Sequence, residues 1–130
     1  MTDLNAGIVL LTVVAIAFGG AFLLRVVGGQ VPANELQRTY FRAGHAHAGV
    51  LVILGLVIGL YLRGADVPAW AETMSVGVLL GAILMPLGFF LSVVGRDPQR
   101  PNAMRWCIAA GGISVVVGVI GAGAGLVVVG

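Results

Sequence analysis

The segment Ala43–Leu62 reads AGHAHAGVLVILGLVIGLYL and contains no charged residue. As an α-helix it would rise about 30 Å, which is the thickness of the hydrocarbon core of a bilayer. Three further blocks are comparably long and apolar, and we expect them to span the membrane at about residues 6–27, 71–94 and 103–129. The sequence therefore predicts an all-α integral membrane protein, a four-helix bundle in which residues 1–130 form a single four-span transmembrane domain.

The composition excludes an ordinary soluble domain. Of 130 residues, 59% are hydrophobic and only 9% are charged, whereas soluble domains are about one quarter charged. The seven basic residues are all arginine and stand near the ends of the apolar blocks, where they orient helices and do not form a nucleic-acid-binding patch. We therefore expect the lipid bilayer, and no nucleic acid, as a partner. The single cysteine, Cys107, excludes an internal disulfide.

Local signals predict where several helices begin and end. Asp3 or Asn5 is expected to cap the first helix, and Gly28–Gly29 is expected to end it. Asn34 followed by Gln37 matches a capping box, which predicts that the second helix begins near Glu35. Residues 35–42 would then be an interfacial helical extension ahead of the second span. Pro86 is expected to kink the third span, because proline removes a backbone donor.

The distribution of arginine predicts the orientation of the chain. Six arginines lie on the side of the first and third loops, and only Arg63 lies on the side of the second loop. The six are Arg25, Arg38, Arg42, Arg96, Arg100 and Arg105. By the positive-inside rule, loops one and three are cytoplasmic and both termini lie outside, an N-out/C-out multi-pass protein of the cell (inner or plasma) membrane.

The 21 glycines predict closely packed helices. Several fall in pairs of small residues spaced by four, namely Gly44/Ala48, Gly55/Gly59, Gly77/Gly81, Gly118/Ala122 and Gly121/Gly125. Lipid provides no hydrophobic driving force between helices, so close approach across small residues must hold the bundle together. We expect part of this packing to serve contacts between chains, and hence a homo-oligomer or a larger membrane complex.

Both histidines lie at the start of the second span. Helical spacing places Arg38, Arg42 and His45 on one face, while His47 is about 200° from His45 around the helix. These four residues are the candidate cofactor-binding residues. In one interpretation, both imidazoles simply bond to headgroups, loop carbonyls or neighbouring backbone. In a second, His45 binds heme or another metal and the arginines pair with heme propionates. In a third, His45 and Arg42, with Arg105 as a further member, line a quinone or anionic-ligand site.

The fragment Gly44–Gly55, GHAHAGVLVILG, resembles uncharacterised small four-span bacterial membrane proteins that carry an H-x-H pair at the start of helix 2. More distantly, it resembles histidine-bearing helices of the catalytic subunit of heme–copper oxidases. The first resemblance implies a bacterial inner membrane, and the second implies heme b as a cofactor. No other apolar block contains a histidine, so a second axial ligand would have to come from another subunit, a symmetric dimer or Met104.

No catalytic set is evident, because both histidines lie on one helix and no charge lies in the middle third of any span. We therefore predict a non-catalytic accessory or scaffolding subunit, without a cofactor, that self-associates or joins a larger membrane complex. The alternative is a heme- or quinone-binding redox component that uses His45 with Arg38 and Arg42. A second alternative is a carrier of a small hydrophobic or anionic solute.

Overall fold

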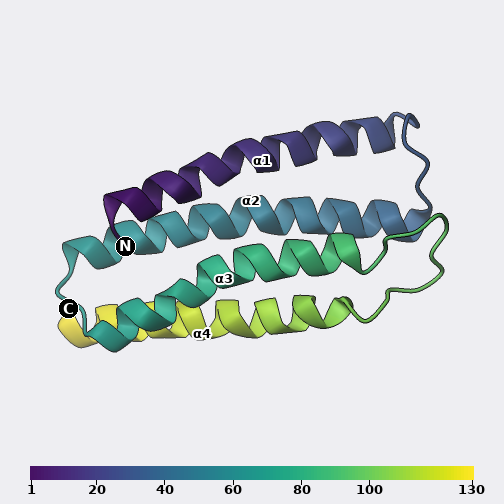
Figure 1. Cartoon of the computed structure of the whole chain (residues 1–130). Helices are drawn as coiled ribbons and strands as arrows, with labels where there is room; N and C mark the ends of the chain where they lie inside the picture. Colours follow the sequence, from purple (N-terminus) through teal and green to yellow (C-terminus); the bar gives the residue numbers. More distant parts are fainter.

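The protein is an all-α, four-helix bundle. A computed structural model describes all 130 residues, Met1–Gly130. Its helices are α1 (Asp3–Val27), α2 (Glu35–Gly64), α3 (Ala69–Leu91) and α4 (Arg105–Val129), with no strand. All four are long and apolar enough to cross a membrane, as the sequence predicted. Successive helices run antiparallel, so both termini lie at the same end of the bundle (Figure 1).

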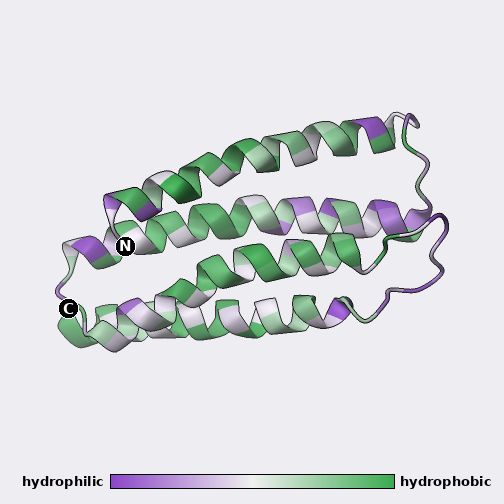
Figure 2. Ribbon diagram, in the orientation of Figure 1, coloured by the Kyte–Doolittle hydropathy of each residue, from purple (hydrophilic) through white to green (hydrophobic).

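The four helices form an open row in chain order. Helix α3 packs most extensively on α4, α2 packs on α3, and α1 approaches only α2 closely (Figure 1). Large apolar side chains are exposed along all four helices. Hydrophilic residues collect at the helix ends and loops (Figure 2). This pattern is that of helices surrounded by lipid, where an apolar surface carries no penalty. The row leaves α1 with a single supporting helix.

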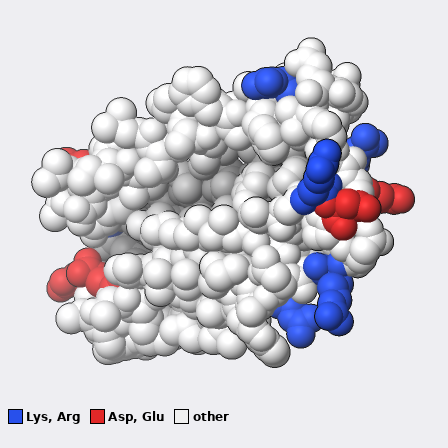
Figure 3. All heavy atoms as spheres, turned by 45° about the vertical axis from the view of Figure 1, so that its right-hand side comes forward, with Lys and Arg blue, Asp and Glu red and all other residues white.

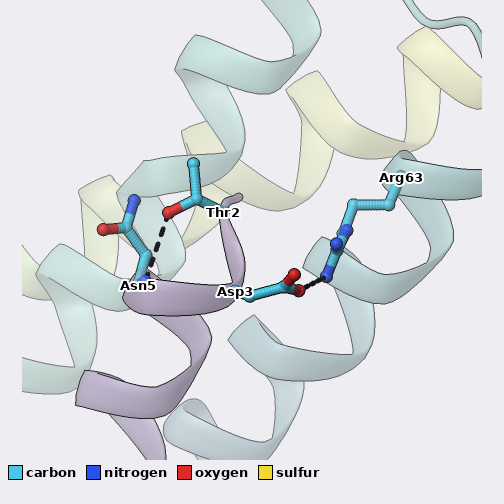
Figure 4. A network of polar contacts seen from close by, with 4 residues as sticks. All are labelled: Thr2, Asp3, Asn5 and Arg63. Atoms are coloured by element: carbon cyan, nitrogen blue, oxygen red, sulfur yellow. Dashed lines mark hydrogen bonds and ion pairs between the residues drawn. The ribbon is translucent and has the colours of Figure 1, made fainter.

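Helix α1 begins at Asp3 and is capped by Thr2, one residue before the first of the two predicted caps. Thr2 is the cap: its backbone is extended and its hydroxyl accepts a hydrogen bond from the Asn5 N–H at 3.2 Å. The expected cap by Asp3 or Asn5 was therefore wrong, because Asp3 is already inside the helix. Its carboxylate instead forms an ion pair with Arg63, the last charged residue of α2, at 2.6 Å (Figure 4). At the other end the helix stops at Gly28, as predicted, and Gly29 adopts a left-handed φ of 74°.

Helix α2 begins with the predicted capping box. The Asn34 side chain accepts from the Gln37 N–H at 2.9 Å, and the Gln37 side chain accepts from the Asn34 N–H at 3.1 Å. The helix then runs for 30 residues without a break. Residues 35–42 and the predicted span 43–62 therefore lie on one continuous helix.

The ends of α3 and α4 differ from the expected bounds by two or three residues. Helix α3 ends at Leu91, short of the expected residue 94, because Asn102 folds back onto it. The Asn102 N–H donates to the Ser92 carbonyl at 2.8 Å, and its side chain donates to the Leu91 carbonyl at 2.9 Å. Helix α4 consequently starts at Arg105 and not at residue 103. Pro86 lies inside α3 without interrupting it, and α3 is curved in Figure 1.

Candidate functional site

The glycines predicted for helix packing mostly lie between helices of the same chain. Gly44 and Gly55 face the α3 side chains Phe89, Phe90 and Leu79, and Gly59 faces Met1. On the other side of the row, five small residues of α3 and α4 meet one another's backbone or side chains: Gly77, Gly81, Gly118, Gly121 and Gly125. Ala122 is buried, and Ala48 lines a cavity described below.

Two interface glycines were missed by the sequence analysis. A Cβ on Gly88 would lie 2.7 Å from the Ile108 backbone nitrogen, and one on Gly111 would lie 2.9 Å from the Met85 nitrogen. The available signal was a seven-residue repeat, since Gly111, Gly118 and Gly125 follow one another at that spacing. A seven-residue repeat marks one continuous helix seam, and spacing by four does not reveal it.

Hydrogen bonds from the side chains of Asn34 and Gln37 join the start of α2 to the loop between α3 and α4. The Gln37 side chain is buried and donates to the carbonyls of Val93 (3.1 Å) and Gly95 (2.9 Å). The Asn34 amide donates to Asp97 Oδ1 (2.7 Å) and to the Pro98 carbonyl (2.8 Å). The same two side chains thus cap α2 and hold the third loop. The capping-box pattern indicated the first role and carried no signal for the second.

His45 lies between α2 and α1. Its half-buried imidazole packs against Gly19 and Gly20, where an added Cβ would lie 3.4 Å and 3.3 Å from the ring. The absence of side chains at these two positions makes room for the ring. The His45 imidazole forms no hydrogen bond within the chain. Every fully buried side-chain nitrogen or oxygen in the protein has a hydrogen-bond partner, so the His45 nitrogens are not fully buried and are accessible from the adjoining space.

His47 faces α3. Its Nδ1 lies 2.7 Å from the Ala43 carbonyl oxygen, and its ring centroid lies 5.1 Å from that of Phe89. The two histidines therefore face different neighbouring helices, as their spacing predicted. No group of three or more histidine, cysteine, aspartate and glutamate side chains is placed to hold a metal ion. Helix α4 does not approach α1, and neither Met104 nor Arg105 lines the space beside His45.

Three phenylalanines contact one another at the loop end of α1, α2 and α3, and one of them, Phe90, lines the space beside His45. The Phe41 ring meets Phe22 of α1 edge-on, with centroids 5.4 Å apart. On its other side the Phe41 ring stacks on Phe90 of α3, with centroids 5.3 Å apart and planes inclined by 19°. This aromatic cluster bridges α1, α2 and α3 in the turn that precedes His45.

Next to the aromatic cluster, residues of α1, α2 and α3 line a groove. The part nearest His45 is a cavity of about 310 Å³, and a second cavity of about 350 Å³ lies toward the chain's N-terminus. Val9, Leu79 and Ile83 line both cavities, so the two cavities adjoin one another along the same groove. Figure 3 shows the surface hollowed between α1, at the top, and the helices beneath it. We call this space the α1–α3 groove.

Arg38 and Arg42 lie outside the α1–α3 groove. Both side chains are exposed, neither lines either of the two cavities of the groove, and neither forms an ion pair. They belong to the cationic end of the molecule, where Figure 3 shows most of the arginines. Of the four candidate cofactor-binding residues, the structure thus places His45 alone in the groove. Comparison of the chain with protein-family models, curated proteins and solved structures gives no match.

Proposed function

We propose that this protein is a small, non-catalytic membrane subunit that self-associates through the outer face of α4. The observation that carries this proposal is a second set of small residues on that helix. The inward face of α4 packs against α3. On the outward face, a Cβ added at Gly112 or Gly123 would have no atom within 4 Å. They are eleven residues apart, about three helical turns, so they share one face.

The face that contains Gly112 and Gly123 suits a close approach by another helix. Val116 and Ile120 between them are exposed, as is Ala109 one turn before Gly112. Helices associate in lipid through dispersion contacts at such small-residue surfaces, because apolar area alone gives no advantage over lipid tails. A second copy of the chain provides a matching face, and a two-fold axis would place the two α4 helices against each other.

Substitution of the two outward glycines tests this assembly. We expect Gly112→Leu and Gly123→Leu each to lower the association constant about tenfold, equivalent to about 1.4 kcal/mol, measured by energy transfer between labelled chains in lipid vesicles. Gly7→Leu is the matched control, because Gly7 of α1 also has nothing within 4 Å. A monomeric parent protein, or equal dissociation of the Gly7→Leu variant, would contradict the proposal.

The charge distribution supports a plasma (inner) membrane location with loops one and three in the cytoplasm. The end formed by these loops carries six exposed arginines and two carboxylates, Glu35 and Asp97. The opposite end carries Arg63 and three carboxylates, Asp3, Asp66 and Glu72. Excess arginine marks the cytoplasmic side of short loops, so both termini are assigned to the outer side.

A further inference from the structure

We infer that the α1–α3 groove binds a neutral, quinone-type lipid, with a ring carbonyl on the His45 imidazole and the apolar chain lying along the groove. This binding site is additional to the assembly role proposed above and uses the opposite flank of the row. His45, Phe90 and the two adjoining cavities are the features that indicate the chemistry of the ligand.

The hydrogen-bonding state of His45 calls for an external partner. The imidazole is half-buried against α1 and has no partner within the chain, whereas Nδ1 of His47 is already engaged with the Ala43 carbonyl. A neutral imidazole presents one N–H donor and one acceptor nitrogen. Lipid tails offer it no partner, and an unsatisfied donor in an apolar medium is costly. A ligand that brings a carbonyl oxygen into the groove satisfies the donor.

The groove has the shape and lining of a site for a flat ring with a long tail. Phe90 lines the same 310 Å³ cavity as His45, so the wall of this cavity includes an aromatic side chain whose ring is fixed by stacking on Phe41. This volume is within the range of small-molecule sites, which begins at about 300 Å³. The tail would pass Val9, Leu79 and Ile83 into the second cavity, whose lining includes Ile8 and Val76.

The electrostatics of the groove favour a neutral headgroup. None of the twelve residues that line the cavity beside His45 is an acid or an arginine, and Glu72 lines only the second cavity. Arg38 and Arg42, which would attract a phosphate, line neither cavity. Of the aromatic cluster Phe22–Phe41–Phe90, only Phe90 lines the cavity, and all three rings are uncharged. An anionic lipid whose phosphate sits on the arginines is therefore not the expected occupant.

Binding of menaquinone-4 tests the inference directly. Full-length protein in phosphatidylcholine nanodiscs is titrated with the quinone, and the amount bound above protein-free nanodiscs is measured by chromatography. We expect saturable binding that His45→Leu weakens about tenfold, the effect of losing one hydrogen bond in an apolar site. His47→Leu is the matched control and should bind as the parent does. In the parent, the ¹⁵N resonances of His45, and not those of His47, should shift with quinone.

A second pair of variants tests the groove without altering either histidine. Ala15 lines the cavity beside His45, and Ala17 is exposed on α1 outside it. Ala15→Phe should fill the cavity and abolish saturable binding, while Ala17→Phe should leave binding unchanged. This pair keeps the test informative if His45→Leu does not fold.

Four results would overturn the inference. They are binding that does not saturate, equal loss of binding in the His45 and His47 variants, a His45-dependent Soret band in the purified protein, and displacement of the quinone by phosphatidylglycerol. The third would identify heme as the ligand, and the fourth an anionic phospholipid. We expect His45→Leu to leave self-association unchanged in the energy-transfer assay. Failure of the quinone-binding inference can therefore be distinguished from failure of the self-association proposal.

Discussion

Gln37 illustrates how one buried polar side chain can hold two parts of the chain together. Its amide oxygen completes the cap of α2, and its amide nitrogen reaches two carbonyls at the end of α3 and in the third loop. Removal of the side chain leaves the Val93 and Gly95 carbonyls without this donor, and Val93 is fully buried whereas Gly95 is exposed. The cost is then set by desolvation as well as by the lost bonds.

We predict that Gln37→Ala lowers the free energy of unfolding by about 1–3 kcal/mol. The measurement is thermal or denaturant-induced unfolding in detergent micelles, followed by circular dichroism. Gln30→Ala is the control, because Gln30 is exposed in the first loop and makes no side-chain hydrogen bond, and it should change stability little. Equal stability of the two variants would show that the Gln37 hydrogen bonds do not stabilise the attachment of the third loop to α2.

His45, unlike Gln37, is a polar side chain without a hydrogen-bond partner in the chain. The glycine pair Gly19–Gly20 opens a space for an imidazole that finds no partner within the chain. Histidine in this position is a poor choice for packing alone, because an apolar side chain would fill the space without an unsatisfied donor. This unpaired imidazole is the observation on which the proposed quinone site rests.

At the scale of helices, the α3–α4 pair is the most closely packed part of the molecule. Gly77 and Gly81 of α3 meet the α4 backbone, and the Ser114 hydroxyl donates to the Gly77 carbonyl at 2.9 Å. Such an interhelical bond forms only because the two backbones approach closely. Glycine provides that approach, and dispersion between the backbones replaces the hydrophobic effect that lipid removes.

We predict that Gly118→Ala loosens the α3–α4 pair and costs about 1–3 kcal/mol of stability. The added Cβ would lie 2.7 Å from the Val78 backbone nitrogen, which cannot move without displacing α3. Gly49→Ala is the control in α2, where an added Cβ meets nothing within 4 Å. That control should be neutral or stabilising by up to about 1 kcal/mol, the gain in helix propensity. Unfolding curves in the same detergent compare the two, and similar destabilisation by both would contradict the packing argument.

At the scale of the whole molecule, the open row explains why α1 is the least supported helix. It has one fully buried residue, Val26, and contacts α2 chiefly through Phe22 and the Gly19–Gly20 pair. At its other end the Asp3–Arg63 ion pair is exposed, so it contributes at most about 1 kcal/mol. This arrangement leaves the space between α1 and α3 open, which is the origin of the groove.

The proposed orientation predicts which loop is accessible from outside the cell. In a Cys107→Ser background, a membrane-impermeant maleimide should label Asp66→Cys in intact cells. Gln99→Cys should react only after lysis, because the positive-inside rule places the third loop in the cytoplasm. Both positions are exposed in the structure, so a difference in labelling reports sidedness and not burial. The reverse labelling pattern would show that the termini are cytoplasmic.

The sequence by itself determined the elements of this protein. Four apolar blocks, the Asn34–Gln37 box and Gly28–Gly29 act through neighbouring residues and through transfer to lipid, so the four helices, the start of α2 and the end of α1 were predictable. The cap of α1 was wrongly assigned because Thr2, Asp3 and Asn5 are all acceptable caps locally.

Only the tertiary structure decided how the helices are arranged and which polar groups are satisfied. The sequence contains small residues on several faces, and it does not state which face meets which helix. The contacts of Gly111 with Met85, of Gln37 with Val93 and of His45 with Gly20 join residues far apart in the chain. Such contacts depend on the order and spacing of packed helices, a property of the whole bundle that no local pattern encodes.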